Sequence, residues 1–358
     1  MQALFGVIFH FIGGFASGSF YIPYKKVKGW AWESFWITGG IFSWLLAPFV
    51  AAWLTIPGFM HIIQQTSGSV LFYTFLFGVL WGIGGLTYGL GVRYLGISLG
   101  STIILGLCSV FGALIPSFYY NFNPTPGKDS FNTLLHTHWG QWVLFGIAIC
   151  VLGIVICGRA GTLKERDLSK SDVKSNNAEY KFGLGLFVSI VSGVLSACFA
   201  FGLDAGSSMA HTAGDIWKAA HPGQGEFLFR NNVTYIVLLW GGLTTNFIWC
   251  MILNARNRTF GNYTDKKTPL KANYLFSALA GTTWFLQFFF YGMGESRLGN
   301  GASSWILHMA FIILTANIWG LALKEWKGVS RKALFTVLAG ILTIIVSVLI
   351  VGYGNSIK

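Results

Sequence analysis

Long apolar stretches alternate with short polar segments along this chain, and their lengths define its elements. A helix needs about 20 apolar residues to cross the roughly 30 Å hydrocarbon layer of a bilayer. Stretches of this kind lie at residues 3–21, 32–54, 70–88, 95–118, 138–156, 182–203, 233–253, 273–292, 304–323 and 333–353. The pattern therefore predicts an all-α integral membrane protein with ten transmembrane helices. The first stretch lacks a preceding basic residue and is followed by Lys25, Lys26 and Lys28, so we expect a retained helix and not a cleaved signal peptide.

Two parts of the chain match each other in one ungapped frame. The matching residues are Gly78, Trp81, Tyr88, Gly89, Gly91, Leu95, Gly96, Ser101 and Ile103 with Gly281, Trp284, Tyr291, Gly292, Gly294, Leu298, Gly299, Ser304 and Ile306. In the first and sixth stretches, Gly6, Gly14, Ser17 and Phe20 match Gly185, Gly193, Ser196 and Phe199. A longer loop at 205–232 in the second copy accounts for the different spacing.

These matches predict two repeats, residues 1–158 and 182–358, joined by a charged cytoplasmic linker at 159–181. Because each repeat has an odd number of helices, the second enters the membrane from the opposite face. Inverted repeats are typical of secondary transporters, whose substrate lies near the midplane. Duplication without transport is the alternative.

The third and eighth stretches each carry a stripe of glycines and aromatic residues on one helix face. The stripes are Gly78, Trp81, Gly85 and Tyr88, and Gly281, Trp284, Phe288 and Tyr291. Gln287 adds an amide to the second copy, where the first has Gly84. An aromatic wall with a few polar groups can hold a small sugar, so Trp81, Tyr88, Trp284, Gln287, Tyr291 and also Trp305 are candidate substrate contacts. Helix packing is the alternative, and it is the default for glycines such as Gly39 with Gly40, which allow close helix approach.

Composition supports the membrane class, with 54% hydrophobic and only 10% charged residues and a mean hydropathy of +0.60. The net charge of +12 lies in loops, which favours orientation beside anionic lipid over nucleic-acid binding. Most Lys and Arg follow odd-numbered helices, and the opposite side holds Lys128, Lys218, Arg230, Arg297 and Lys358. The basic side is predicted to be cytoplasmic, with both termini periplasmic.

Motifs for other chemistry are missing from the sequence. The five cysteines lie in or at the ends of apolar stretches without metal-ligand spacing, so we expect no metal and no disulfide. A membrane-embedded enzyme or a receptor remains an alternative class, but the sequence has no H-E-x-x-H motif and no P-loop for ATP. We expect no cofactor. Because the apolar stretches hold few fixed charges, a neutral substrate is favoured over an ionic one.

A proton could be carried by few residues. His10 and His308 lie within predicted helices, and Glu33, Asp204 and Glu295 lie at helix ends. Ionisable groups inside a bilayer are costly and tend to be functional, and histidine titrates near neutral pH. His10, Glu33, Asp204 and His308 are the candidates for proton coupling. Neutral histidines that hydrogen bond between helices are the alternative for His10 and His308.

Six longer motifs stand out along the chain: YIPYKKVKGWAWE (21–33), YGLGVRYLGISLG (88–100), RAGTLKER (159–166), LQFFFYGMG (286–294), SWILHMAF (304–311) and GLALKEW (320–326). These motifs resemble the L-rhamnose/proton symporters of the drug/metabolite transporter superfamily. The resemblance implies ten helices and uptake of a 6-deoxyhexose, L-rhamnose or a close relative, with protons across a bacterial inner membrane. The sequence differs from that family mainly around 201–220 and in a short glycine-rich hinge, 295–304, that carries Glu295 and Arg297. Export of another metabolite or drug is the alternative within the transporter class.

Overall fold

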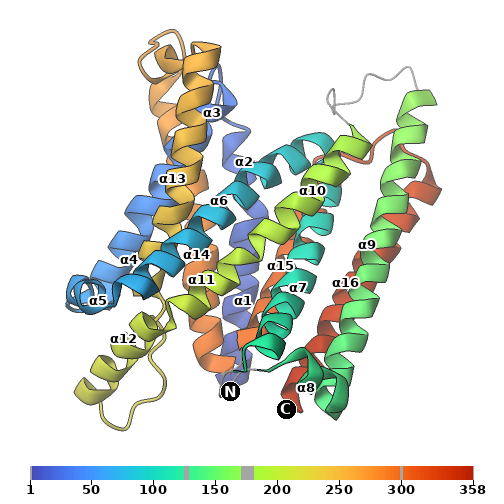
Figure 1. Cartoon of the computed structure of the whole chain (residues 1–358). Helices are drawn as coiled ribbons and strands as arrows, with labels where there is room; N and C mark the ends of the chain where they lie inside the picture. The colour runs from blue at the N-terminus through green and yellow to red at the C-terminus, as the bar shows by residue number, and fades with distance from the viewer. Residues whose placement is uncertain (1, 125–128, 171–180, 299–300, 358) are drawn as a thin grey trace. The chain divides into compact units, whose positions relative to one another are not determined.

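Every regular element in the described part of the chain is a helix (Figure 1). The structure, a computed structural model, describes residues 2–124, 129–170, 181–298 and 301–357. Within these ranges, nine helical segments are long and apolar enough to cross a membrane: Leu4–Tyr24, Trp32–Thr55, Gly68–Leu95, Ile97–Phe122, His138–Leu168, Phe182–Ala205, Asn232–Asn257, Ser304–Ala322 and Arg331–Gly354. The prediction of an all-α integral membrane protein is confirmed.

The predicted eighth span, 273–292, falls within helix α14 (Leu270–Leu298). This helix has 29 residues, which at 1.5 Å per residue exceeds the thickness of the hydrocarbon layer. It is less apolar than the nine segments above because Asn273, Ser277 and Gln287 interrupt it. The count of ten transmembrane helices and the inverted repeat therefore stay predictions.

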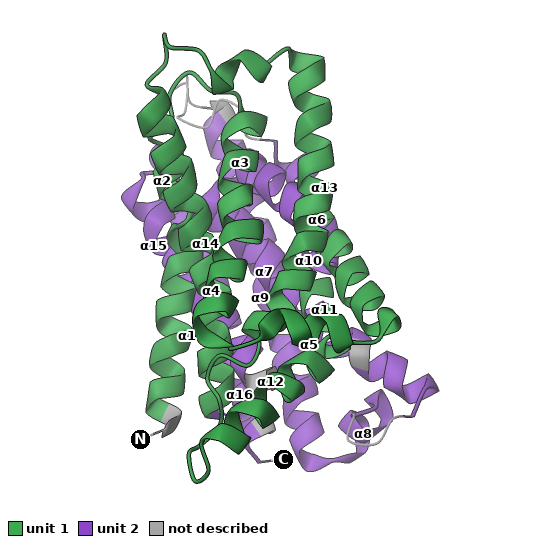
Figure 2. Ribbon diagram, turned by 90° about the vertical axis from the view of Figure 1, so that its left-hand side faces the viewer, with its two compact units in different colours: residues 1–83, 198–297 green, residues 84–197, 298–358 purple. Residues whose placement is uncertain are grey.

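The chain forms two compact units, each of which takes segments from both halves of the sequence (Figure 2). Unit 1 consists of Met1–Ile83 and Cys198–Arg297, and unit 2 of Gly84–Ala197 and Leu298–Lys358. Helix α6 (Gly68–Leu95) passes from unit 1 into unit 2 between Ile83 and Gly84. The predicted repeats describe the order of helices along the chain, whereas the units describe how these helices pack.

Unit 1 contains the first part of α6 and most of the short helices. Its other elements are α1 (Gln2–Ser19), α2 (Tyr21–Tyr24), α3 (Trp32–Ile41), the π-helix η1 (Phe42–Leu46), α4 (Ala47–Thr55), α5 (Phe59–Gln65), α11 (Cys198–Ala205), α12 (Ser207–Ala220), α13 (Asn232–Asn257), the 3-10 helix η2 (Phe260–Tyr263) and α14. One of its apolar cores joins α4, α5, α12 and α13 around Ala52, Phe59, Met209 and Ile236.

Glycines let two pairs of helices in unit 1 approach with their backbones almost in contact. A methyl group at Gly78 of α6 would overlap the carbonyl oxygen of Leu238 in α13, and one at Gly241 would overlap that of Phe75. In the same way, a methyl group at Gly281 of α14 would overlap the carbonyl oxygen of Gly39 in α3. Gly78 and Gly281 are matching positions of the predicted repeat, and both serve close helix packing, as expected for Gly39.

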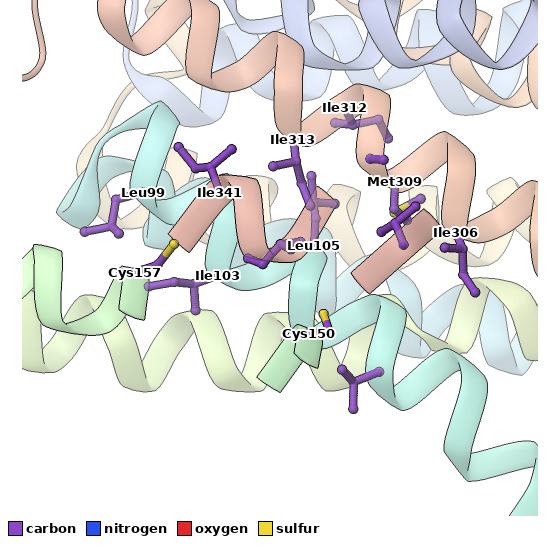
Figure 3. Packing of buried hydrophobic residues seen from close by; sticks show 14 of the residues in the cluster. Leu99, Ile103, Leu105, Cys150, Cys157, Ile306, Met309, Ile312, Ile313 and Ile341 are labelled. Atoms are coloured by element: carbon purple, nitrogen blue, oxygen red, sulfur yellow. The ribbon is translucent and has the colours of Figure 1, made fainter. Parts of the chain in front are cut away.

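The described part of unit 2 contains the rest of α6 together with α7 (Ile97–Phe122), α8 (Phe131–His136), α9 (His138–Lys170), α10 (Phe182–Ser196), α15 (Gly301–Ala322) and α16 (Arg331–Ser356). Leu99, Ile103, Ile306, Ile313 and Ile341 belong to its apolar core (Figure 3). Helices α9 and α16 pack along their length (Figure 1).

Helix α7 begins at a sharp break that the sequence did not predict, since its span was expected to start at Leu95. Gly96 has a positive φ of 88°, which a glycine adopts at no steric cost. The carboxylate of Glu325 then accepts hydrogen bonds from the backbone N–H groups of Ile97 (3.1 Å) and Ser98 (3.2 Å). A negative charge at this position stabilises the helix N-terminus.

Three other expectations need correction. Helix α9 continues to Lys170, so the first twelve residues of the predicted linker are helical, and 171–180 lie outside the described residues. The predicted loop at 205–232 contains α12, a helix of 14 residues. Glu295 and Arg297 lie in the last turns of α14 and not in a hinge, since no glycine follows Gly294 until Gly299; 299–300 are outside the described residues.

Candidate functional site

Four tryptophans of unit 1 form one connected group, which we call the tryptophan cluster: Trp36, Trp44, Trp81 and Trp284. The ring of Trp284 contacts all the others, with centroids 5.5 Å from Trp36, 5.3 Å from Trp44 and 6.1 Å from Trp81. All four side chains are buried. The cluster brings α3, η1, α6 and α14 together, and it contains Trp81 and Trp284, two of the predicted substrate contacts.

Three phenylalanines extend the cluster. Phe20 stacks on Trp284 with centroids 4.6 Å apart and planes inclined by 18°. Phe288 lies edge-on to Trp81 at 5.7 Å and stacks on Phe199 at 4.5 Å. Stacked and edge-on pairs at these distances are attractive beyond their burial of apolar area. The result is an extended aromatic surface in the interior of unit 1.

Small residues make room for the rings. A methyl group at Gly40 would overlap the ring of Trp44, and one at Gly242 would lie 2.6 Å from the ring of Trp81. The Nε1 atom of Trp36 donates a hydrogen bond to Oδ1 of Asn246 at 2.8 Å. Asn246 in turn donates from Nδ2 to the carbonyl oxygens of Gly82 and Gly242 at 3.1 and 2.8 Å. The orientation of Trp36 is thus fixed by a buried amide on α13.

Polar groups follow the cluster along α14. Gln287, one turn after Trp284, is buried, and its Oε1 accepts a hydrogen bond from Oγ of Ser17 at 2.7 Å. Tyr291, one further turn along, is also buried, and its ring lies 5.6 Å from that of His10. The predicted residues Trp81, Trp284, Gln287 and Tyr291 therefore all lie in unit 1.

The two remaining predicted contacts lie in unit 2. The hydroxyl of Tyr88 makes a hydrogen bond of 2.6 Å with that of Ser101, which connects α6 to α7. Trp305 on α15 packs beside Gly112 of α7, where a methyl group would lie 3.2 Å from its Nε1. Both side chains pack between helices of their own unit.

A second polar group lies near the C-terminal end of α14. The ring of His10 lies against Gly294. A methyl group added to the Cα of Gly294 would lie only 2.6 Å from Nε2 of His10. The next residue, Glu295, accepts a hydrogen bond from Nδ2 of Asn231 at 2.8 Å. Tyr291 and Glu295 are four residues apart and share one face of the helix. The predicted proton candidate His10 and the predicted substrate contact Tyr291 are therefore neighbours.

Glu226 and Arg230 lie just before this group in the chain. Glu226 makes ion pairs with Lys218 at 2.7 Å and with Arg230 at 3.5 Å. The hydrogen bond from Lys218 lowers the pKa of Glu226, so this carboxylate stays charged at neutral pH.

The other three proton candidates have different surroundings. Glu33 is buried, and its Oε1 accepts hydrogen bonds from Asn257 (3.0 Å) and Thr259 (2.7 Å), so it links the start of α3 to the end of α13. Asp204 is exposed at the end of α11. His308 is buried in α15 of unit 2. The four candidates lie on four different helices, three in unit 1 and His308 in unit 2.

Trp36 and Trp44 were missed by the sequence analysis. Their segment reads as a continuous apolar run, so periodicity did not single out one face. Two local signals were present. The Gly39–Gly40 pair marks a close helix contact, and Pro48 in the middle of a predicted helix marks a disturbed turn.

The chemical groups of this arrangement suit a small uncharged molecule. The members of the tryptophan cluster carry no charge, and their rings offer flat apolar faces on which the C–H groups of a sugar can stack. Gln287 supplies both a donor and an acceptor for hydroxyl groups. Within the described ranges, no three His, Cys, Asp or Glu side chains stand close enough to hold a metal ion.

Comparison with known proteins places the chain in a family. It matches the L-rhamnose-proton symport protein family over residues 2–357. An L-rhamnose-proton symporter of Klebsiella pneumoniae is 35% identical over 354 residues, which cover 98% of this chain and 97% of the relative. One from Yersinia pestis is 34% identical over 356 residues, 98% of each protein, and one from Salmonella paratyphi A is 35% identical over 354 residues, 98% of this chain and 97% of the relative. The chain therefore belongs to the L-rhamnose-proton symport protein family, as the sequence motifs indicated, and is a multi-pass membrane transporter and not an enzyme.

Proposed function

We propose that the protein imports L-rhamnose together with protons by alternating access. The observation that carries this proposal is the family match, which extends over nearly the whole chain. The tryptophan cluster supports it, because an uncharged aromatic site next to the Gln287 amide suits a neutral 6-deoxyhexose, whose methyl group adds to its apolar surface. Export of another metabolite or drug is not favoured by this family.

The substrate contacts in this proposal are Trp81, Trp284, Gln287 and Tyr291 of unit 1, with Tyr88 and Trp305 of unit 2 as further contacts. The burial of the tryptophan cluster supports the first group, since binding there excludes water and strengthens each hydrogen bond. In unit 2, Tyr88 and Trp305 offer a hydroxyl and a ring.

Proton coupling in this proposal requires at least one of His10, Glu33, Asp204 and His308. The geometry favours His10, because its ring lies beside Tyr291 and Gly294 on the helix that carries Gln287. A change in the protonation of His10 would alter the face of α14 that also bears the amide. Glu33 fits a structural role better, since two side chains already bond to its Oε1. The proton is the coupling ion, and no cofactor is needed.

The proposed location is the bacterial inner membrane, with the basic loops in the cytoplasm and both termini in the periplasm. The distribution of Lys and Arg in the sequence supports this orientation. Membrane lipid is the expected surrounding, and nucleic acid is not an expected partner.

The experiment that tests the function is uptake of radiolabelled L-rhamnose into proteoliposomes with and without an imposed proton gradient. We expect accumulation above the external concentration when the outside is acidic, and collapse of this accumulation when a protonophore is added. L-Fucose, another 6-deoxyhexose, serves as the competitor that measures sugar specificity. Accumulation that ignores the proton gradient would contradict symport, and an absence of rhamnose uptake would contradict the substrate.

A further inference from the structure

The π-helix η1 places Ser43 and Trp44 in an unusual turn between α3 and α4. Its hydrogen bonds span five residues and not four, and the N–H of Ala47 accordingly donates to the carbonyl of Phe42. Pro48 explains this turn. It has no N–H to offer the carbonyl of Trp44, and its ring would clash with that carbonyl in a regular α-helix. Single π turns inside α-helices occur frequently at functional sites.

The turn directs Trp44 into the tryptophan cluster. The Trp44 ring lies edge-on to Trp284 at 5.3 Å and to Trp81 at 6.3 Å. Its exposed fraction is 1%, and that of Ser43 is 0%. Ser43 lies one turn after Gly39, whose backbone touches Gly281, and Trp284 lies one turn after Gly281. The two segments run in the same direction, since Lys28 pairs with Asn273 and Gly39 with Gly281. Both residues of the turn are therefore level with the ring at the centre of the cluster.

Within the described residues, Nε1 of Trp44 and Oγ of Ser43 have no hydrogen-bond partner. A buried donor without a partner loses its bonds to water and gains nothing in return. Buried polar atoms of this kind are rare in folded proteins, and each calls for a physical reason. Here two of them lie on neighbouring residues beside the tryptophan cluster.

A comparison within unit 1 strengthens this argument. Helix α13 also has a glycine pair, Gly241–Gly242, and the residues that follow it at the same spacing are Thr245 and Asn246. Thr245 donates to the carbonyl of Val79 at 3.0 Å, and Asn246 donates to that of Gly82 at 3.1 Å. Ser43 and Trp44 occupy the corresponding positions after Gly39–Gly40. Oγ of Ser43 and Nε1 of Trp44 make no such hydrogen bond to another helix.

We propose that Nε1 of Trp44 and Oγ of Ser43 bind hydroxyl groups of the transported sugar and determine which hydroxyl arrangement is accepted. The inference rests on the proposed function. The indole N–H can only donate, whereas the serine hydroxyl can donate and accept. Together they recognise two neighbouring hydroxyls of an uncharged sugar that stacks on Trp284. A substrate without the matching hydroxyl leaves the donor unpaired again and binds less tightly.

The test is the affinity of purified full-length Trp44→Phe protein for L-rhamnose, measured by titration calorimetry in detergent. Phenylalanine keeps a ring but removes the N–H. We expect binding to weaken about three- to tenfold, and Ser43→Ala to weaken it by a similar factor. Trp30→Phe is the matched control, because Nε1 of Trp30 is also buried without a partner, but its ring packs on Tyr263 and Tyr274, away from the cluster.

Rhamnose analogues that each lack one ring hydroxyl separate hydrogen bonding from packing. The wild type should bind one of these analogues more weakly than it binds rhamnose. For this analogue, the affinity of Trp44→Phe should be no lower than the affinity of the wild type. Equal affinity of the wild type and Trp44→Phe for rhamnose would overturn the proposal, and so would an equal loss for every analogue. Failure of the folded wild type to bind rhamnose would instead contradict the proposed function, so the two failures are distinguishable.

Discussion

Single side chains in unit 1 divide into those that are already bonded and those that are free to bond. Oε1 of Gln287 accepts from Ser17, but a carbonyl oxygen has two lone pairs and can accept a second hydrogen bond. Ser17 thus orients the amide without blocking it. A sugar that reaches Gln287 meets an acceptor whose direction is fixed beforehand, and less entropy is lost on binding.

Replacing Trp284 or Gln287 by alanine should weaken rhamnose binding by about 1–3 kcal/mol each, because a stacking ring or a fixed amide is lost. The measurement is the dissociation constant of purified variants. Trp53→Ala is the control, since Trp53 is 66% exposed on α4 and belongs to no part of the cluster. Wild-type affinity in both the Trp284 and the Gln287 variant would assign these residues to packing alone.

The proton candidates can be separated by comparing accumulation with exchange. We expect His10→Gln to abolish uphill accumulation of rhamnose while counterflow, which needs no net proton movement, partly survives. Glu33→Gln keeps the Oε1 acceptor that Asn257 and Thr259 use, so it should retain both activities. Asp204→Asn and His308→Gln complete the series.

If all four variants concentrate rhamnose as the wild type does, the assignment of the proton to this set is wrong. Glu295→Gln is then the next variant, because Glu295 shares a helix face with Tyr291 beside His10.

Part of the site could be predicted from residues, and part could not. Trp81 and Trp284 stood out because each repeats a spacing of three and four with glycines and aromatic residues. Trp36 and Trp44 lie in a run that is apolar on all sides, where periodicity carries no information. His10 lies on α1 and Tyr291 on α14, and nothing in the sequence indicates that these two distant residues are in contact.

At the scale of elements, glycines set the distance between helices. Gly78 and Gly241 bring α6 against α13, and Gly39 and Gly281 bring α3 against α14. These contacts carry Trp81 and Trp284 into the same cluster. The sequence analysis predicted close helix approach at Gly39 but not which helix packs there, because a glycine in the sequence indicates a close contact and not the identity of the neighbouring helix.

Gly78→Ala should destabilise the protein by about 1–3 kcal/mol, because the added methyl group forces α6 away from the backbone of α13. The thermal unfolding midpoint in detergent measures this effect. Gly158→Ala in α9 is the control, since a methyl group there meets no atom within 4 Å and alanine favours a helix. Equal midpoints for Gly78→Ala and the wild type would show that the contact is not tight.

Helix ends were harder to predict than helix centres. The central parts of the predicted spans are helical, but α9 extends to Lys170 and α6 to Leu95. Hydropathy reports where lipid surrounds a helix, and a helix can continue into water when its residues favour helical structure. The charged segment that starts at Arg159 ended the predicted span without ending the helix.

At the scale of the whole molecule, the distribution of Lys and Arg predicts the orientation in the membrane. Cysteines introduced at Lys26 and Lys170 should react with a membrane-impermeant maleimide only after the membrane is permeabilised, because both positions are predicted to be cytoplasmic. The five native cysteines are buried, which keeps the background reaction low. Labelling of these cysteines from outside intact cells would contradict the predicted topology.

The polar character of α14 has a consequence for how the protein is made. Its Asn273 and Gln287 bond to residues near or in the first helix, since Nδ2 of Asn273 donates to the carbonyl of Lys28 and Oε1 of Gln287 accepts from Ser17. These partners are synthesised long before α14 leaves the ribosome. The translocon inserts each segment into the bilayer according to the hydrophobicity of that segment, so it inserts a polar helix such as α14 poorly. Insertion of α14 should therefore depend on α1 remaining close to the translocon. The order in which the helices are synthesised would then be part of what allows this chain to enter the membrane.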